Sequence, residues 1–304
     1  MSGPTRSRHD GGRDRERPPL PEALPHPVVD NHCHLDIADG PEGSWLPTEE
    51  ALDRAASVGV TRVVQIGCDL PGARWAVDIA AAHDAVVAGV ALHPNEAPVL
   101  AERGRLDEGL AEIEALAAHE RVRAVGETGL DYFRTGPDGR ADQRRSFREH
   151  IALAKRLDKT LVIHDRDAHD DVLAILDEEG VPDRFVMHCF SGDAAFARAC
   201  LDRGGWLSFA GTVTFKNAEP VREALRMAPL ERVLVETDAP YLTPTPFRGR
   251  PNASYLVPLT IRAMAQTRGA GLVDLCRAVD ANTDAAYGGP WGGRRADVAS
   301  RSGP

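Results

Sequence analysis

The sequence predicts a (β/α)8 barrel, the TIM-barrel fold, with a functional site at the carboxyl-terminal face of its strands. Between residues 27 and 288, eight short apolar runs alternate with longer amphipathic stretches, which is typical of parallel strands connected by helices. No obvious linker divides these residues, so one closed barrel is more economical than an open sheet. An open doubly wound sheet is the alternative, but no GxGxxG turn follows the first strand, which leaves a dinucleotide site unsupported.

The eight apolar runs define the expected strands. These strands are residues 28–35, 61–67, 86–93, 123–130, 160–165, 184–189, 206–210 and 232–237. The clearest helix candidates between them are residues 49–60, 141–158 and 218–228. Residues 1–26, rich in Arg and Pro, and the Gly-punctuated residues 289–304 are expected to be disordered tails around a single hydrolase domain of residues 27–288.

Composition excludes several classes of protein. A chain of 304 residues with 42% hydrophobic content can bury a sizeable core. The formal charge of -10 argues against a broad basic face for nucleic acid, and no stretch reaches the ~18 uncharged apolar residues that span a bilayer. Five cysteines without CxxC spacing fit reduced thiols, and the amino terminus lacks the apolar run of a secretory signal, so a cytoplasmic location is expected.

Five of the predicted strands end in residues of the types that bind metal ions. The candidates are His32 and His34 on the first strand, Glu127 on the fourth, His164 on the fifth, His188 on the sixth and Asp238 on the eighth. A single such histidine is more often a hydrogen-bonded core residue, but four histidines and two acids at strand ends point to a metal site. In a barrel these ends converge on the face where barrel enzymes place their sites.

The H-x-H spacing on the first strand has a geometric reason. Side chains two residues apart on a strand project to the same side, so His32 and His34 can hold one ion together. The residue between them, Cys33, then points toward the helix layer, and Cys189 beside His188 is expected to do the same. Both thiols are therefore predicted to be core fillers and not ligands.

A nitrogen and oxygen donor set without thiolate suits two divalent ions, Mg²⁺, Mn²⁺ or Zn²⁺. The simplest assignment gives His32, His34 and Asp238 to one ion and His164 and His188 to the other, with Glu127 as the bridge. Ions ~3.5–4 Å apart lower the pKa of a shared water, which then attacks near neutral pH. The ligands sum to about -2 against +4 from the ions, and this locally cationic pocket favours an anionic electrophile such as a phosphodiester.

Other residues at the predicted site face have more open roles. Besides Glu127, Asp238 is a catalytic candidate because a carboxylate can accept the proton of the attacking water. Glu236 is either a support for a ligand or a buried structural acid. His93 closes the third strand and either faces substrate or is a loop histidine. The substrate-phosphate candidates in the loops after the strands are Arg134, Arg166, Lys216 and Arg248, with Arg250 nearby.

Five segments of the chain resemble a known family. DNHCHLD, GETGLDY, VIHDRDA, MHCFSG and ETDAPYLTP are similar, in order and spacing, to the signature segments of the TatD family of metal-dependent deoxyribonucleases within the amidohydrolase superfamily. The resemblance covers nearly all of residues 28–288. It implies a barrel, divalent metals, and hydrolysis of DNA at a 3′ end or in single strands. The same six ligand candidates stand at the matching motif positions, and neither a membrane nor an obligate protein partner is expected.

Two rival readings of the site remain. A small-molecule amidohydrolase acting on a lactone or cyclic amide would have a similar barrel, but many such enzymes bridge their ions with a carboxylated lysine on the fourth strand. Lys155, Lys159 and Lys216 are the only lysines, and Glu127 occupies that strand end instead. Hydrolysis of a D-aminoacyl ester on tRNA is a further variant. A non-catalytic binding barrel would require a missing ligand, and none is missing.

Overall fold

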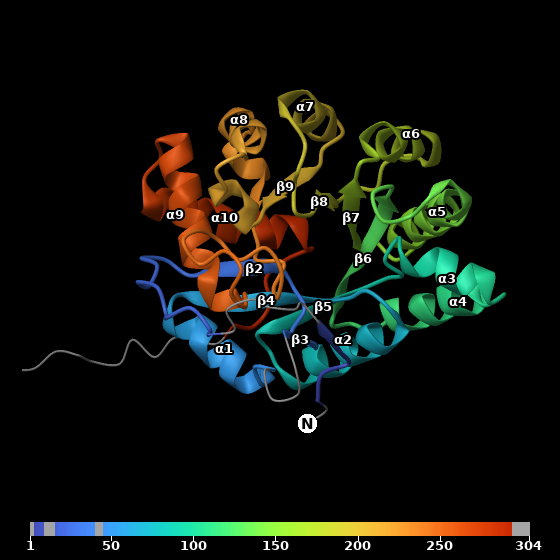
Figure 1. Cartoon of the computed structure of the whole chain (residues 1–304), viewed down its shortest axis with the longest axis horizontal. Helices are drawn as coiled ribbons and strands as arrows, with labels where there is room; N and C mark the ends of the chain where they lie inside the picture. Colours follow the sequence, from blue (N-terminus) through green and yellow to red (C-terminus); the bar gives the residue numbers. More distant parts are fainter. Residues whose placement is uncertain (1–2, 9–15, 40–44, 294–304) are drawn as a thin grey trace, which may run out of the picture.

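The computed structural model describes residues 3–8, 16–39 and 45–293, and it is a parallel eight-stranded barrel inside a layer of helices (Figure 1). Neighbouring strands pair in parallel in the order of the chain. The barrel strands are β2 (Val28–Cys33), β4 (Val60–Gly67), β5 (Val86–Val90), β6 (Val122–Asp131), β7 (Thr160–Arg166), β8 (Phe185–Met187), β9 (Trp206–Phe209) and β10 (Val233–Val235). The predicted fold class and all eight strands are confirmed.

The first and last strands meet and bring the barrel close to a full circle. Cys33 and Ala239 form a parallel bridge just beyond the end of β10. The His34 backbone N–H donates to the Ala239 carbonyl at 2.8 Å, and the Asp238 N–H donates to the His32 carbonyl at 2.9 Å. Two segments about 200 residues apart in the chain are thereby held together at the face where the ligand candidates lie.

Helices follow the strands and cover the barrel from outside. Within the described residues they are α1 (Thr48–Ser57), α2 (Leu70–Ala82), α3 (Glu96–Glu102), α4 (Leu106–Ala117), α5 (Arg140–Arg156), α6 (His169–Glu179), α7 (Ala194–Asp202), α8 (Glu219–Met227), α9 (Val257–Arg268) and α10 (Leu272–Ala286), with short 3₁₀ turns at Pro137–Gly139, Gly211–Thr214, Leu230–Arg232 and Ser254–Leu256. Side-chain caps begin two of them: Asp69 accepts from the Gly72 N–H at 2.7 Å, and Asp193 accepts from the Phe196 N–H at 2.9 Å. Among the described helices, none combines the length and the apolarity needed to cross a bilayer.

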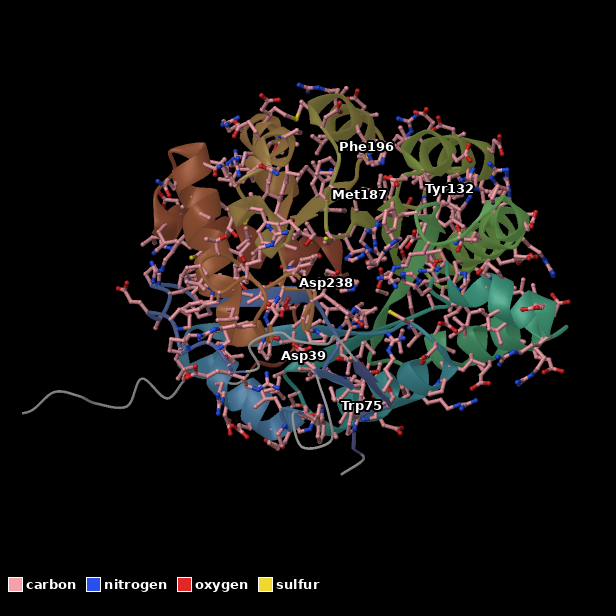
Figure 2. The ribbon with its side chains drawn as sticks, viewed as in Figure 1. Asp39, Trp75, Tyr132, Met187, Phe196 and Asp238 are labelled. Carbon is pink, nitrogen blue, oxygen red and sulfur yellow. The ribbon has the colours of Figure 1, made fainter. Side chains whose placement is uncertain are left out.

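Apolar side chains fill the barrel in two layers. The interior holds one or two residues from each strand, small or branched except for Trp206 of β9, and the larger layer lies between strands and helices. In Figure 2, Asp238 lies toward the middle of the ring of elements, whereas Phe196 of α7 and Trp75 of α2 lie in the helix layer. The buried Tyr287 and Trp291 cover the amino-terminal end of the barrel. The Trp291 indole N–H donates to the Ala85 carbonyl at 3.3 Å.

The expected tails are only in part outside the fold. Residues 289–293 include the buried Trp291, so this part of the predicted tail packs on the barrel, while residues 294–304 lie outside the described residues. At the other end, β1 (Arg6–Arg8) pairs in parallel with β3 (Ile37–Asp39), and the Tyr255 hydroxyl donates to the Pro18 carbonyl at 2.7 Å. The expectation of disorder was wrong for residues 3–8 and 16–26, because backbone pairing and docking hold them without an apolar pattern that composition would show.

One ion-pair cluster ties the amino-terminal end of the barrel to the last helix. The buried Arg62 guanidinium donates at 2.6 Å to both Asp280 and Asp284 of α10 and lies 4.6 Å from the centre of the Trp291 ring. We expect Arg62→Ala to lower the free energy of unfolding by about 2–4 kcal/mol, because two partly buried carboxylates lose their partner. Chemical denaturation measures this, with the exposed Arg105→Ala as the matched control. Equal losses in both variants would contradict the assignment.

Candidate metal centre

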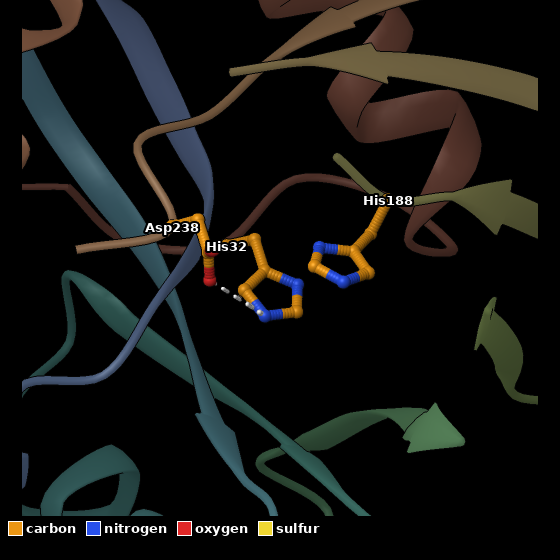
Figure 3. Close-up of side chains that lie close together, drawn as sticks. All are labelled: His32, His188 and Asp238. Carbon is orange, nitrogen blue, oxygen red and sulfur yellow. Dashed lines mark ion pairs between the residues drawn. The ribbon is translucent and has the colours of Figure 1, made fainter. Parts of the chain in front are cut away.

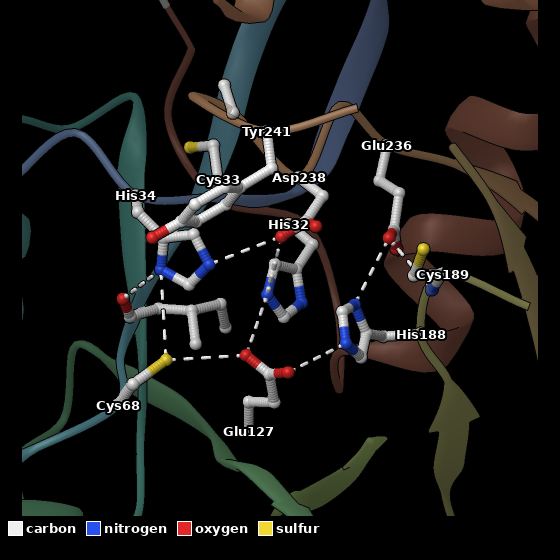
Figure 4. Close-up of polar contacts among 12 residues, drawn as sticks. His32, Cys33, His34, Cys68, Glu127, His188, Cys189, Glu236, Asp238 and Tyr241 are labelled. Atoms are coloured by element: carbon white, nitrogen blue, oxygen red, sulfur yellow. Dashed lines mark hydrogen bonds and ion pairs between the residues drawn. The ribbon is translucent and has the colours of Figure 1, made fainter. Parts of the chain in front are cut away.

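Glu127 stands at the centre of the site, and ligand candidates surround both of its carboxylate oxygens. Glu127 Oε1 lies 2.6 Å from His164 Nδ1 and 2.8 Å from His188 Nε2. On the other side, Glu127 Oε2 lies 3.4 Å from His32 Nε2 (Figure 4). The carboxylate is buried, and Glu127 lies in the middle of β6, at the register shift between Gly126 and Thr128 in its pairing with β7. One side chain therefore faces two groups of histidines that come from three other strands.

Asp238 joins the cluster from the segment after β10. Its Oδ1 lies 3.3 Å from His34 Nε2 and 3.9 Å from His32 Nε2. His32 also stacks on His188, with ring centres 3.9 Å apart. In Figure 3, His32, His188 and Asp238 converge on one space from three separate segments, and their ligand atoms all lie within 4.8 Å of one another. All six ligand candidates of the sequence analysis are thus brought together.

The described residues contain three overlapping groups of ligand type, and their grouping differs from the simplest assignment. These groups are His32 with His188 and Asp238, His32 with His34 and Glu127, and His93 with Glu127 and His164. The assignment had paired His188 with His164 on the second ion. Because His32 and Glu127 each belong to two groups, the side chains form one continuous cluster.

His93 lies beside the ligand candidates, and the sequence analysis left it either facing substrate or as a loop histidine. Strand β5 ends at Val90, so His93 lies in the following loop, where its N–H donates to the Cys68 carbonyl at 2.8 Å. Its Nδ1 accepts from the Asn95 N–H at 3.0 Å. This leaves Nε2 directed at Glu127, 3.5 Å from Oε1, with the His164 ring 4.6 Å away.

Two backbone features set the positions of the central carboxylates. At Gly126, which precedes Glu127, a Cβ would lie 2.5 Å from Cβ of Val162, so only glycine allows β6 to approach β7 this closely. Asp238 has φ of 54°, in the left-handed region that is unfavourable for most residues. Such strain is typical of functional sites, and here it turns the carboxylate toward His34.

Hydrogen bonds orient the rings of two ligand candidates. His34 Nδ1 lies 3.0 Å from the Ile66 carbonyl, which can only accept, so Nδ1 carries the proton and Nε2 presents a lone pair to the cluster. His188 Nδ1 lies 3.2 Å from Glu236 Oε1, which orients its Nε2 toward Glu127. Glu236 also accepts from the Cys189 N–H at 2.8 Å. Of the two roles left open for Glu236, the structure favours the support of a ligand.

Asp30 holds the segment between β10 and Asp238. Its carboxylate accepts from the Thr237 N–H at 2.8 Å and from the Thr237 hydroxyl at 2.6 Å. Burial raises the pKa of Asp30 to about 7, and these hydrogen bonds only partly oppose that shift. Asp30 therefore acts on the position of Asp238 through the backbone.

Sequence reasoning missed two neighbours of the ligand candidates. Cys68 Sγ donates to Glu127 Oε2 at 3.3 Å, and Asp131 Oδ2 lies 3.4 Å from His164 Nε2. Each directly follows a predicted strand, so position at a strand end was the available signal. Burial raises the pKa of the Cys68 thiol well above its usual range, which keeps it a neutral donor.

The pKa shifts of Glu127 and His188 indicate that the cluster stabilises positive charge. Burial alone would raise the pKa of Glu127, but the charges of His188 and His93 and the hydrogen bonds from His164 and His188 lower it well below its usual range. Burial alone would lower the pKa of His188, yet the charges of Glu127 and Glu236 raise it well above its usual range. The buried carboxylates therefore stabilise a cation among them.

Unpartnered nitrogen atoms show that a metal ion fits this cluster. Among the described residues, Nδ1 of the fully buried His32 has no hydrogen-bond partner, and His32 Nε2 and His164 Nε2 each lie 3.4 Å from a carboxylate oxygen without an aligned hydrogen bond. Buried polar atoms without partners are rare because each costs about 1–3 kcal/mol. Imidazole donors suit Zn²⁺, and carboxylate donors suit Mn²⁺ or Mg²⁺, so this mixed donor set is compatible with each of the three ions.

The two cysteines beside the ligands behave differently. Cys33 is buried in the strand–helix core as predicted, and its thiol donates to the Val64 carbonyl at 3.6 Å. For Cys189 the prediction of a helix-layer filler was wrong. Its φ of 44° breaks the strand alternation on which that prediction depended, and the residue is half-buried beside Glu236 (Figure 4).

The cationic substrate candidates lie in loops that follow the strands. Arg134 is exposed after β6, Arg166 ends β7 with its guanidinium 3.8 Å from the centre of the exposed Phe133 ring, and Lys216 is exposed after β9. Arg248, exposed after β10, lies 4.3 Å from the centre of the Phe215 ring. Their roles toward substrate stay predictions.

Comparisons with known proteins agree with the resemblance in the motifs. A sequence model of the family described as TatD related DNase matches residues 29–288. The chain is 46% identical over 268 residues to the uncharacterized metal-dependent hydrolase TatD of Mycobacterium tuberculosis, which spans 87% of this chain and 99% of that protein. It is 40% identical over 256 residues to the uncharacterized metal-dependent hydrolase YcfH of Escherichia coli, with 84% and 93% covered.

Solved structures share the same architecture. The crystal structure of YJJV, a TatD homologue from Escherichia coli, superimposes with a TM-score of 0.76 at 27% identity and covers 86% of this chain and 98% of that one. A TatD family hydrolase from Entamoeba histolytica gives a TM-score of 0.75 at 20% identity, with 87% and 99% covered, and is similar in fold.

Proposed function

The chain belongs to the TatD family of metal-dependent hydrolases, and from this premise we propose that it hydrolyses phosphodiester bonds of DNA, at a 3′ end or in single strands, with two divalent cations. The observation that carries the proposal is Glu127. Its Oε1 faces His164 and His188 while its Oε2 faces His32, which is the arrangement a bridging carboxylate requires. Two divalent cations held there would present positive charge to the oxygens of a phosphodiester.

The residues of the cluster divide the work in this proposal. The side chains that would hold the cations are His32, His34, Glu127, His164, His188 and Asp238. When bound, two such cations neutralise the charge that develops on phosphoryl oxygens and lower the pKa of water at the site. Asp238 is the proton acceptor, because its side chain is 14% exposed whereas those of Glu127 and Glu236 are 5% and 0% exposed. Glu236 orients His188.

The positions of the lysines support this proposal over an amidohydrolase with a carboxylated lysine bridge. Lys159 donates to the His119 and Val122 carbonyls at the amino end of β6, opposite to Glu127. Lys155 donates to the Glu179 carbonyl at the end of α6, and Lys216 is exposed after β9. An enzyme for a lactone, a cyclic amide or a D-aminoacyl-tRNA ester would therefore have to use Glu127, and not a carboxylated lysine, as the bridge between its cations.

Removal and return of metal tests the proposal. The protein is stripped with EDTA and then given Mg²⁺, Mn²⁺ or Zn²⁺ with single-stranded oligonucleotides labelled at either end. We expect no cleavage in the stripped protein, because the stripped cluster holds no cation that could activate water. Cleavage is expected to return with at least one of the three ions. Cleavage that survives chelation, or no cleavage with any ion alongside turnover of a lactone or D-aminoacyl ester, contradicts the proposal.

A further inference from the structure

A short segment near the amino terminus lies against the site face of the barrel. We call Thr5–Arg8 the N-terminal strap. It pairs in parallel with β3, with Arg6 opposite Ile37. The Thr5 N–H donates to the Asp36 carbonyl at 2.9 Å, and the Thr5 hydroxyl donates to Asp36 Oδ2 at 2.6 Å. In Figure 1 the first described segment, in dark blue, lies beside β3 and α2. The strap is thus fixed to the segment that directly follows the H-x-H strand.

The strap places the Arg6 guanidinium next to residues that contact the metal cluster. Arg6 Nη1 lies 3.5 Å from Asp69 Oδ2 at the start of α2. Asp69 follows Cys68, whose thiol donates to Glu127. Arg6 lies within electrostatic range of Cys68, Tyr241, Asp69 and Asp36, and its pKa is raised overall although burial alone would lower it. The Tyr241 ring in turn meets the His34 ring edge-on, 6.0 Å between centres. Arg6 therefore lies near two residues, Cys68 and Tyr241, that each contact a ligand candidate.

The guanidinium of Arg6 has hydrogen-bonding capacity that the described residues do not use. Its Nε is buried without a hydrogen-bond partner among them. The 3.5 Å contact with Asp69 is long, whereas Arg62 contacts each of its carboxylates at 2.6 Å. A guanidinium carries five N–H donors in a planar fork that matches phosphate oxygens. The side chain is also 37% exposed, so an anion can reach it.

We propose that Arg6 binds a phosphate of a polynucleotide substrate other than the one being hydrolysed, so that the N-terminal strap is part of the substrate site. The inference rests on the proposed function and extends it to a substrate with several phosphates. A net charge of -10 repels such a substrate at long range, so binding depends on the few cationic side chains at the rim of the site. Arg6 lies outside residues 29–288, which the family model matches, so this contact belongs to the strap.

Arg6→Gln tests the inference, with Arg145→Gln as the matched control. Arg145 is exposed on the outer face of α5 and pairs with Asp107. For oligonucleotide cleavage we expect Arg6→Gln to raise KM about tenfold with little change in kcat, because one charged hydrogen-bonding group is lost from binding. Hydrolysis of bis(p-nitrophenyl) phosphate, which has a single phosphodiester, is expected to stay unchanged. Arg145→Gln is expected to alter neither.

A binding measurement gives a readout independent of turnover. In EDTA, the affinity for a single-stranded oligonucleotide is measured against salt concentration, and the slope of log K against log salt is expected to fall by about 0.7 in Arg6→Gln. Thr5→Val removes the side-chain anchor to Asp36 and is expected to give a smaller change in the same direction.

The outcomes separate this inference from the proposed function. If the wild-type protein cleaves oligonucleotides and Arg6→Gln matches Arg145→Gln in KM and salt slope, the inference alone is wrong. Equal loss on both substrates together with a lower Tm indicates a structural role for Arg6 and also overturns it. If the wild-type protein binds oligonucleotides without cleaving them, the proposed function fails while the salt slope still decides on Arg6. A protein that neither binds nor cleaves overturns both.

Discussion

Glu127→Gln is expected to lower kcat by about 10³-fold or more while the barrel still folds. The substitution keeps the size of the side chain but removes the negative charge that faces His164, His188 and His32 at once. A neutral amide cannot bridge two cations, and its NH₂ group would point a donor at an imidazole nitrogen. The bound metal per chain, measured by elemental analysis after dialysis, is expected to fall along with turnover.

A matched substitution makes this result specific. Glu108→Gln changes the same functional group at a side chain that is 70% exposed on α4, and it is expected to leave turnover and metal content unchanged. Circular dichroism and Tm check that both variants are folded. If Glu127→Gln retained wild-type turnover with a full complement of metal, Glu127 could not be the bridge, and the proposed mechanism would lose its central residue.

The fold could be predicted from the sequence because its signals are local and repeated. Each strand is an apolar run between amphipathic segments, and residues at strand ends follow the strands to one face. That is why His32 and His164, about 130 residues apart, could be placed at one site before any coordinates. The structure bears this out, since both contact Glu127.

The errors of the sequence analysis arose where the strands stop. Strand alternation assigns a side to each residue only while the backbone stays extended, and Cys189, with φ of 44°, has already left β8. His93 lies three residues beyond β5, so its approach to Glu127 depends on loop contacts such as that with Cys68. The N-terminal strap was missed because a three-residue strand held by backbone pairing has no apolar period to detect.

Asp238→Asn separates binding of metal from proton transfer and is the second substitution with a large expected effect. Burial alone would raise the pKa of Asp238, but the contact with His34 and the nearby His188 and His32 lower it, so the carboxylate is ionised. The amide cannot accept the proton of the attacking water. We expect kcat to fall about 10²–10⁴-fold.

The backbone at this position makes asparagine the informative replacement. Asp238 has φ of 54°, which asparagine tolerates and alanine does not, so Asp238→Asn keeps the loop in place. Asp158→Asn is the matched control, because Asp158 has φ of 51° and is exposed between α5 and β7 at the opposite end of the barrel. It is expected to retain full turnover.

Metal content distinguishes the two roles of Asp238. His32, His34 and Glu127 remain in Asp238→Asn, so most of the metal is expected to stay bound while turnover is lost. Loss of metal in proportion to activity would make Asp238 a ligand alone and would pass the proton to another acceptor.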